Sequence, residues 1–526
     1  MSETDSSVNP WIVAATVILP ALMEVLDTSI VNVALPHMQG SFSATQDQIT
    51  WVLTSYLVAN GIVLPMTGWL SRVFGRKLFL IGCVVTFTVA SFMCGASTTL
   101  GMIVFFRIVQ GVSGGALQPM SQSILLETFP AEEQGMAMAL WGVGIVTAPV
   151  IAPLLGGWIT DHYSWRWVFY INIPVGLLAF FMTRWFITDP PYAKRQKVSF
   201  DSWGIIFLAL AIGALQIMLD KGQKEDWFDS NFIIYLALIS AIAFIALIIR
   251  EYRAEEPVVD MDVFKNRTFS AGTFTMFLFG FGIYAWVSLI PLYVQNLMGY
   301  TATESGLVIS PRGAGVMVTM FIAGWYLRKG WDARWILLMA MPFLILAGLD
   351  LVNLNLNAGF TYIAFPNFTQ GLGLGLIFVP LASSTMSKIS PDKMGNATGI
   401  FNLARNIGGS IGIATTQTLL ARLSQQHQNY LVSNINPYNP VFRHKYESIL
   451  NGLATGSQDY TGINHLSEKV LGIIYGMVQK QAAMLAYIDV FWLVTIMFLL
   501  MIPSILLMRP RKSDPAAGVH RNSGTN

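Results

Sequence analysis

Three ionisable residues interrupt long apolar segments near the start of the chain: Glu24, Asp27 and Arg107. Counted back from the ends of their segments, Asp27 and Arg107 lie ~10–12 Å from the same side, at the helical rise of 1.5 Å per residue. Glu24 precedes Asp27 by about one helical turn and shares roughly the same helix face. A charged group at such depth is costly unless it is paired or hydrated, and such groups usually have a function.

Proton exchange is the chemistry that this arrangement favours. Removal from water raises the pKa of a carboxyl group, whereas a nearby guanidinium lowers it. An acid balanced between the two can bind a proton on one side of a membrane and release it on the other. We expect Asp27 and Glu24 to couple protons, with Arg107 tuning Asp27, no other cofactor, and entry from outside. The alternatives are a structural ion pair and, for Glu24, a position facing a hydrated cavity.

Membrane-spanning helices must position these residues. The chain has 526 residues, of which 54% are hydrophobic and 11% charged, against about a quarter charged in soluble proteins. Runs of ~20 apolar residues cross a bilayer as helices. The sequence therefore predicts an all-α polytopic membrane protein with candidate spans at about 11–35, 49–70, 78–97, 100–126, 137–159, 167–187, 202–220, 231–250, 269–293, 304–327, 335–353, 361–385, 397–421 and 485–508.

Several function classes are excluded by the same sequence. A net charge of +2 leaves no dense basic surface for nucleic acid. A phosphate loop of the GxxxxGK[ST] kind and a His–Glu zinc motif are missing from the sequence. We therefore expect no ATP-driven export, no enzyme and no metal site.

The distribution of positive charge predicts the orientation. Most of the 31 Lys and Arg residues fall in inner loops and tails if the N-terminus is cytoplasmic. An even number of spans then returns the C-terminus to the cytoplasm. The polar, acidic start is unlike a cleaved signal peptide. These features predict a multi-pass protein of the bacterial inner membrane with both termini cytoplasmic.

The sequence also contains an internal repeat. GWLSRVFGRK (Gly68–Lys77) is echoed by GWYLRKGWDAR (Gly324–Arg334), and QGVSGGALQP (Gln110–Pro119) by QGLGLGLIFVP. The two offsets nearly agree. Such a repeat indicates two similar helical bundles related by an axis along the membrane normal.

Three regions follow from the repeat. Residues 1–190 are expected to form an N-terminal six-helix bundle, and residues 266–526 a C-terminal one. Residues 191–265 form a linker with two extra spans that have no partner in the repeat. A long polar periplasmic loop is expected at about 422–485.

The order of several motifs carries a resemblance to a known family. The motifs are LDTSIVNVALP (Leu26–Pro36), GWLSRVFGRK, RIVQGVSGG (Arg107–Gly115), APVIAPLLGG (Ala148–Gly157), SPRGAG (Ser310–Gly315) and NLARNIGGSIG (Asn402–Gly412). In this respect the chain resembles the major facilitator superfamily and, within it, the fourteen-helix drug:proton antiporters. QKQAAMLAYIDVFW (Gln479–Trp492) makes it similar to the EmrB-type inner-membrane component of tripartite multidrug efflux pumps. The match covers the chain from about Trp11 to Met508.

This resemblance implies a fold and a function. The fold would be the major facilitator fold, with two six-helix bundles and two inserted helices. The function would be proton-coupled efflux of lipophilic drugs by alternating access, an antiport that confers antibiotic resistance. A periplasmic adaptor and an outer-membrane channel would be partners if the host has two membranes. The alternatives are a dedicated exporter of one physiological compound, such as a siderophore or fatty acid, and a non-transporting membrane receptor.

The resemblance also implies roles for two motifs. Gly68, Arg72, Gly75, Arg76 and Lys77 would form a cytoplasmic gate whose ion pairs break on opening, with positive-inside anchoring as the alternative. Arg72 stands where the family usually has an aspartate, which puts the usual charge relay in doubt.

The second motif, in the fifth span, is expected to favour exchange and prevent leak. It consists of Pro149, Pro153, Gly156 and Gly157, with Ala152 at a position where glycine is more usual. Proline removes backbone hydrogen bonds and glycine permits close packing. A structural kink is the alternative.

The remaining candidates are less sharply defined. Arg312 and Arg405 are charged residues within predicted spans of the second bundle that either polarise the cavity or have structural roles. Polar and aromatic residues that could line a substrate cavity, or simply pack between helices, are Asn32, Tyr56, Gln118, Gln122, Trp141, Tyr284 and Gln295.

Overall fold

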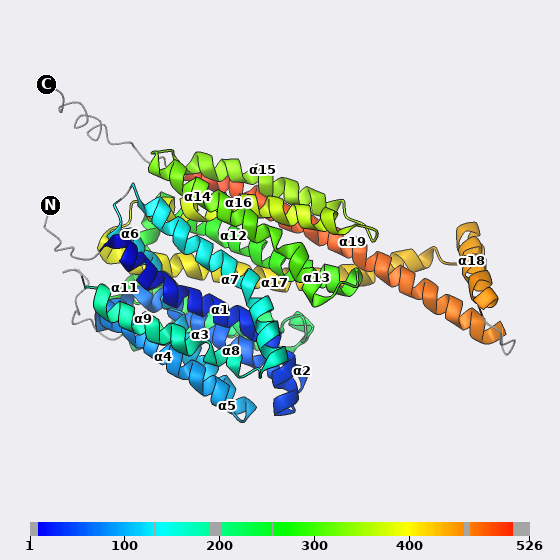
Figure 1. Ribbon diagram of the computed structural model, residues 1–526, viewed down its shortest axis with the longest axis horizontal. Helices are drawn as coiled ribbons and strands as arrows, with labels where there is room; N and C mark the ends of the chain where they lie inside the picture. The colour runs from blue at the N-terminus through cyan, green and yellow to red at the C-terminus, as the bar shows by residue number, and fades with distance from the viewer. Residues whose placement is uncertain (1–8, 131, 190–200, 255, 457–462, 509–526) are drawn as a thin grey trace, which may run out of the picture.

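The computed structural model describes residues 9–130, 132–189, 201–254, 256–456 and 463–508. Within these residues the secondary structure is helical, and no strand occurs. The long helices lie side by side in a bundle (Figure 1). The all-α fold predicted from the sequence is confirmed.

Twelve helices in the described part of the chain are long and apolar enough to cross a membrane. They coincide with twelve of the predicted spans. The other two spans, 137–159 and 397–421, lie within α7 (Gln134–His162) and α17 (Met394–Ser433), which are outside this set of twelve. The total of fourteen crossings therefore stays a prediction.

The helices before the linker form one packed group, here called the first half. Its elements are α1 (Pro10–Phe42), α2 (Gln46–Ile49), α3 (Trp51–Phe74), α4 (Arg76–Ala96), α5 (Leu100–Gly114), α6 (Leu117–Thr128), α7, α8 (Trp167–Tyr170) and α9 (Asn172–Phe186). α1 packs against α6, α7 and α9, while α3 and α4 pack against α5. α1 therefore contacts helices from both ends of this group.

The second half follows the linker. Its elements are α12 (Arg267–Leu292), the π-helix η4 (Tyr293–Leu297), α13 (Ala302–Ile309), α14 (Pro311–Arg328), α15 (Ala333–Val352), α16 (Phe360–Met386), η5 (Pro391–Lys393), α17, α18 (Pro440–Gly456) and α19 (Ile463–Leu507). α14 and α15 pack against α16, and α12 packs against α17 and α19.

Between the halves the chain forms α10 (Ser202–Lys221), η2 (Trp227–Asp229), α11 (Asn231–Arg253) and η3 (Met261–Lys265). α10 packs against α11, α3 and α17. α11 exposes large apolar side chains, among them Ile242 (66%) and Ile245 (60%), as expected of a helix that faces lipid. The domain boundaries predicted from the repeat stay predictions.

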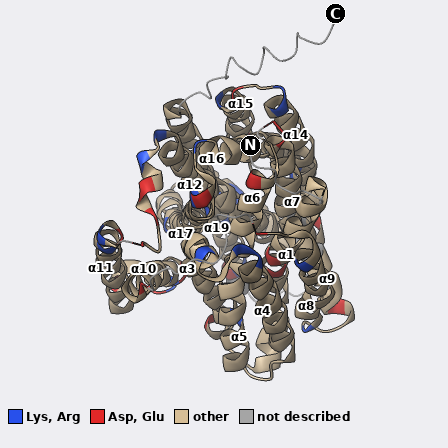
Figure 2. Ribbon diagram, turned by 90° about the vertical axis from the view of Figure 1, so that its left-hand side faces the viewer, with Lys and Arg blue, Asp and Glu red and all other residues tan. Residues whose placement is uncertain are grey.

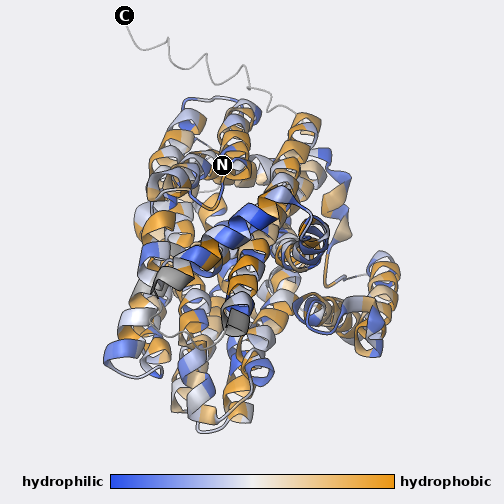
Figure 3. Ribbon diagram, turned by 90° about the vertical axis from the view of Figure 1, so that its right-hand side faces the viewer, coloured by the Kyte–Doolittle hydropathy of each residue, from blue (hydrophilic) through white to orange (hydrophobic). Residues whose placement is uncertain are grey.

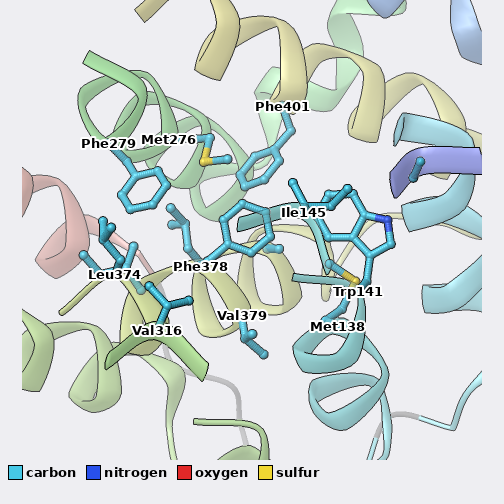
Figure 4. Close-up of a cluster of buried hydrophobic side chains, with 14 of the residues drawn as sticks. Met138, Trp141, Ile145, Met276, Phe279, Val316, Leu374, Phe378, Val379 and Phe401 are labelled. Carbon is cyan, nitrogen blue, oxygen red and sulfur yellow. The ribbon is translucent and has the colours of Figure 1, made fainter. Parts of the chain in front are cut away.

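An apolar cluster joins the two halves. Met138, Trp141 and Ile145 of α7 lie against side chains of α12, α14, α16 and α17 (Figure 4). The Trp141 and Phe378 rings stack with centroids 5.5 Å apart. α7 thus contributes to both halves, packing on α1 and also on α14 and α16.

The halves also meet at the end of the bundle where α1 begins and α19 ends, here called the termini side (Figure 1). A Cβ atom added to Gly68 would lie 2.4 Å from the Asn396 backbone nitrogen. A Cβ atom on Gly324 would lie 3.1 Å from the Gly135 carbonyl oxygen. Backbones of the two halves therefore touch, and the termini side is closed. The predicted orientation makes this side cytoplasmic.

At the opposite end, here called the α18 side, helices replace most of the predicted loop at 422–485. α17 continues to Ser433 and α19 begins at Ile463, so both extend far beyond the predicted spans. At 1.5 Å per residue, α19 is about 67 Å long, roughly twice the bilayer core. Hydrophilic and hydrophobic residues are mixed on the helices seen at this end (Figure 3). The polar composition of residues 422–485 predicted a loop, but in the structure it belongs largely to helices that extend beyond the apolar core of the bilayer.

Charge is sparse on the membrane-spanning helices. Most of the ribbon carries no Lys, Arg, Asp or Glu (Figure 2). The buried exceptions in α1, α5 and α17 are Glu24, Asp27, Arg107 and Arg405. Among these four residues, Glu24 and Arg405 come from opposite halves.

Candidate functional site

Asp27 and Arg107 form a buried ion pair. The Arg107 Nη1 atom donates to Asp27 Oδ2 at 2.6 Å, and both side chains have no exposed surface. Arg107 Nε also donates to the Val52 carbonyl oxygen at 3.0 Å. The common depth predicted from helical rise therefore corresponds to direct contact between α1 and α5.

Two amides complete the coordination of Asp27. Asn172 of α9 donates to Oδ1 at 2.7 Å, and Gln110 donates to the same oxygen at 3.0 Å. Gln110 also accepts from Arg107 Nη1 at 2.8 Å, and Asn172 donates to Ser91 at 3.0 Å. All of these partners donate to Asp27, so the geometry is that of an ionised carboxylate.

The Arg107 guanidinium lies over the Tyr56 ring, 4.1 Å from its centroid. Its Nη2 atom is buried and has no hydrogen-bond partner within the described residues. A cation over an aromatic face is stabilised by the ring quadrupole. Tyr56 thereby links the first acid to the second.

Glu24 lies one turn away on α1 and is 4% exposed. Tyr56 Oη donates to its Oε1 at 3.0 Å, and Asn60 donates to the same atom at 3.1 Å. Gln118 donates to Oε2. Within the described residues Glu24 makes no ion pair; its partners are neutral donors.

A cation of the second half lies beyond Gln118. Arg405 Nη2 donates to Gln118 Oε1 at 2.6 Å. Gln122 likewise accepts from Asn402 at 2.6 Å, and the Pro119 carbonyl accepts from Thr398 at 3.1 Å. Three hydrogen bonds thus connect α6 of the first half to α17 of the second.

Arg312, the other predicted second-half charge, is 5% exposed at the start of α14. Its Nε atom has no hydrogen-bond partner within the described residues. The Arg312 carbonyl oxygen would lie 2.2 Å from a Cβ atom on Gly371, so α14 and α16 touch here. The structure does not bring Arg312 to either acid through a hydrogen bond or an ion pair.

Some of the predicted gate residues make contacts within the first half, and one makes a contact across the two halves. Arg76 pairs with Glu127 of α6, and the Lys77 ammonium donates to the Arg184 carbonyl at 2.7 Å, both within the first half. Gly75 has a φ of 84° and allows the break between α3 and α4. Contact across the halves comes from Gly68. Arg72 lies in the last turn of α3.

The predicted antiporter motif lies on α7. This helix continues as one element from Gln134 to His162, through Pro149 and Pro153. A Cβ atom on Gly156 would meet Ile30 of α1 at 3.2 Å, whereas Gly157 has no such neighbour. The Pro153 side chain lies outside the described part of the structure. The proposed function of the motif stays a prediction.

The predicted cavity residues occupy different environments. Trp141 is fully covered and donates to Ser121 at 2.7 Å. Tyr56, Gln118 and Gln122 belong to the hydrogen bonds described above. Asn32, Tyr284 and Gln295 are exposed. The role of these seven residues in a substrate cavity stays a prediction.

Sequence reasoning missed three partners of the acids: Asn60, Gln110 and Asn172. Gln110 was visible within the repeated QGxxxG pattern, and its equivalent in the second half is Gln370. Asn60 and Asn172 are single polar residues in apolar segments, with no spacing that marks them. Their contact with α1 arises from helix packing alone.

Comparison with known proteins identifies the family of this chain. The sequence profile of the Major Facilitator Superfamily matches residues 17–413. The chain belongs to this superfamily.

Bacterial relatives match over almost the full length. The chain is 36% identical to the multidrug export protein EmrB of Haemophilus influenzae, over 94% of each chain. It is 32% identical to the protein of the same name in Escherichia coli, again over 94% of each. The fatty acid resistance protein FarB of Neisseria gonorrhoeae is 33% identical, with 94% of each covered.

Solved structures agree in fold. The human organic anion transporter MFSD10 aligns with a TM-score of 0.58 at 12% identity, covering 94% of this chain and 100% of the other. A double-tryptophan mutant of XylE aligns with a TM-score of 0.60 at 13% identity, covering 96% and 97%. This major facilitator chain is thus an EmrB-type transporter of the bacterial inner membrane, multi-pass, and not an enzyme.

Proposed function

We propose that this transporter exports chemically unrelated lipophilic compounds across the inner membrane in exchange for protons. Two buried carboxyl groups in one helix carry the proposal: Asp27 is paired with a cation, and Glu24 is held by neutral donors. The names of the relatives, which include multidrug export proteins, support the substrate class. Intramembrane acids of this kind are typical of proton-coupled transporters.

The two acids have different parts in the proposed cycle. Neutralising Asp27 would leave the fully buried Arg107 without a counter-ion, which makes protonation in this conformation costly. Glu24 has no directly bonded cation, so a proton can be added there without breaking an ion pair. In the proposed cycle Glu24 takes up the proton first, and Asp27 follows once the halves move and Arg107 is hydrated.

Transport in proteoliposomes tests the proposal. The purified protein is reconstituted with an imposed pH gradient, and the uptake of a fluorescent lipophilic dye is followed. We expect uptake to require the gradient and to be inhibited by structurally unrelated lipophilic cations. Uptake that proceeds equally without a gradient would refute proton coupling.

A dedicated exporter is the second candidate. The 33% identity to a protein named for fatty acid resistance favours it. Competition separates the two functions, since a dedicated exporter is inhibited by one chemical class alone. If fatty acids compete with each other but unrelated dyes do not, the multidrug proposal fails and the dedicated function holds.

We also propose that α18 and the projecting parts of α17 and α19 bind a periplasmic adaptor that passes substrate to an outer-membrane channel. A groove of about 470 Å³ lies where these helices meet. Its lining includes Leu431, Ile435, Val441, Phe442 and Met477. Val441 is 77% exposed, and Tyr438, close to it in sequence, is 90% exposed. An exposed apolar patch of this kind is typical of a protein interface.

Deletion of α18 tests the adaptor proposal. We expect replacement of residues 436–460 by a short Gly-Ser linker to abolish co-purification with the adaptor while transport into proteoliposomes persists. As a control, the single change Tyr235→Ala alters an exposed aromatic residue of α11 (64% exposed) and should leave co-purification intact. Undiminished co-purification of the deletion variant would contradict this role.

A further inference from the structure

Gln118 joins a buried acid of the first half to a buried cation of the second. Its amide nitrogen donates to Glu24 Oε2, and its amide oxygen accepts from Arg405 Nη2 at 2.6 Å. We call Glu24, Gln118 and Arg405 the inter-half bridge. It connects α1, α6 and α17.

We propose that Gln118 and Arg405 are positioning residues that transmit the protonation state of Glu24 to the contact between the two halves. The proposal rests on the proton coupling set out above. It assigns to these two residues the step that converts proton binding into movement.

The three groups that contact Glu24 fit an ionised carboxylate, because each of them can donate. Tyr56, Asn60 and Gln118 all donate to its two oxygens. An ionised carboxylate accepts hydrogen bonds only, whereas a protonated carboxyl also donates one. The bridge is therefore the arrangement that we expect of the deprotonated state, in which the Gln118 amide lies between an anion and a cation.

Protonation of Glu24 changes the hydrogen bonds that Gln118 can make. The new O–H group needs an acceptor, and rotation of the Gln118 amide supplies its carbonyl. The same rotation turns the amide NH₂ toward Arg405, so that two donors face each other. Arg405 then lacks its bridging acceptor in a site where it is 9% exposed. Its Nε atom already has no hydrogen-bond partner among the residues that the structure describes. An uncompensated buried cation favours opening and hydration.

Among the charged groups that the structure describes around Glu24, only Arg405 is free to balance its charge. The charged or titratable groups near Glu24 are Asp27, Tyr56, Arg107 and Arg405. Asp27 and Arg107 balance each other in their own ion pair. The counter-charge of Glu24 therefore comes from Arg405 in the opposite half.

The position of the bridge suits this role. Along α17, Thr398 and Asn402 bond to α6 first, and Arg405 makes the last of the three hydrogen bonds between the two helices. The contact of Gly68 with Asn396, which helps to close the termini side, lies at the start of the same helix. Loss of the bridge therefore weakens the α6–α17 interface from the end nearer the α18 side.

Tyr56 is the competing acceptor. Its hydroxyl group can rotate and accept from a protonated Glu24 while Gln118 stays in place. That response is confined to the first half and leaves the contact with Arg405 unchanged. The experiment must therefore separate Gln118 from Tyr56.

The test measures the distance between the halves as a function of pH. Spin labels are placed at Leu78→Cys and Lys388→Cys, exposed positions at the termini side of opposite halves, after replacement of Cys83 and Cys94 by alanine. Distances are recorded in nanodiscs at pH 8 and pH 5. We expect the ratio of short to long distances to fall about fivefold or more at pH 5.

Four variants assign the effect. Glu24→Gln should give the low-pH distribution at both pH values. Gln118→Met and Arg405→Gln should each lose the pH-dependent change. The matched control is Gln122→Met, which removes the neighbouring α6–α17 hydrogen bond to Asn402 without touching Glu24. It should keep the full change.

The outcomes distinguish this inference from the proposed function. If Gln118→Met and Arg405→Gln keep the fivefold change, or if Tyr56→Phe alone removes it, the bridge is overturned while proton coupling stands. If the parent protein shows no pH-dependent change, the bridge also fails. Proton coupling itself is tested separately by dye uptake under a pH gradient.

Discussion

At the scale of single residues, the two acids of α1 differ in how their charge is balanced. Asp27 has a direct cationic partner and two amide donors. Glu24 accepts hydrogen bonds from neutral donors, and the Gln118 amide separates it from the Arg405 cation. This difference predicts different responses to substitution.

Arg107→Leu should destabilise the protein by roughly 3–5 kcal/mol, because it leaves the Asp27 carboxylate buried without its counter-ion. The double variant Asp27→Asn with Arg107→Leu should recover at least half of that loss. Thermal unfolding of the purified protein, followed by tryptophan fluorescence, measures both. Equal melting temperatures for the single and double variants would contradict the ion pair.

The acids and Arg107 were predictable because charged residues stand out in apolar segments and helical rise fixes their depth. Their contact partners were not. Asn172 reaches Asp27 only because α9 packs against α1, and a single asparagine carries no periodic signal. The inter-half bridge was also hidden, since it joins Gln118 and Arg405 across 287 residues of sequence.

At the scale of helices, glycines decide how closely the halves approach. Gly68→Ala should disfavour the closed termini side by about 1–3 kcal/mol, since the new methyl group overlaps the backbone of α17. Spin-label distances between Leu78→Cys and Lys388→Cys should lengthen. Gly82→Ala is the control, because no atom lies within 4 Å of a Cβ atom there. Unchanged distances in Gly68→Ala would show that this contact does not limit closure.

Helix positions followed from apolar run length, and the twelve apolar helices overlap the predicted spans. The ends of the helices could not be predicted from the apolar runs. α17 continues twelve residues past the predicted end at 421, through RLSQQHQNYLVS. A helix can extend into water because its backbone hydrogen bonds do not depend on the apolar residues that mark a membrane span. His427 on this extension contacts Asp489 of α19 at 2.7 Å, and this contact ties the two projecting helices together.

At the scale of the whole molecule, the repeat predicted two bundles but not their relative position. Closure of the termini side depends on contacts such as Trp141 with Phe378 and Gly68 with Asn396. Such contacts join segments more than 200 residues apart and leave no local pattern. The proposed exchange requires this closed arrangement to alternate with an opened one as the acids gain and lose protons.

Substrate-induced proton release from proteoliposomes tests this account most directly. The parent protein should release protons when a lipophilic substrate is added, as should Asp47→Asn, a control at an exposed acid with 76% side-chain exposure. Glu24→Gln and Asp27→Asn should each bind substrate but release no protons. Substrate-induced release that persists in both acid variants would contradict the account.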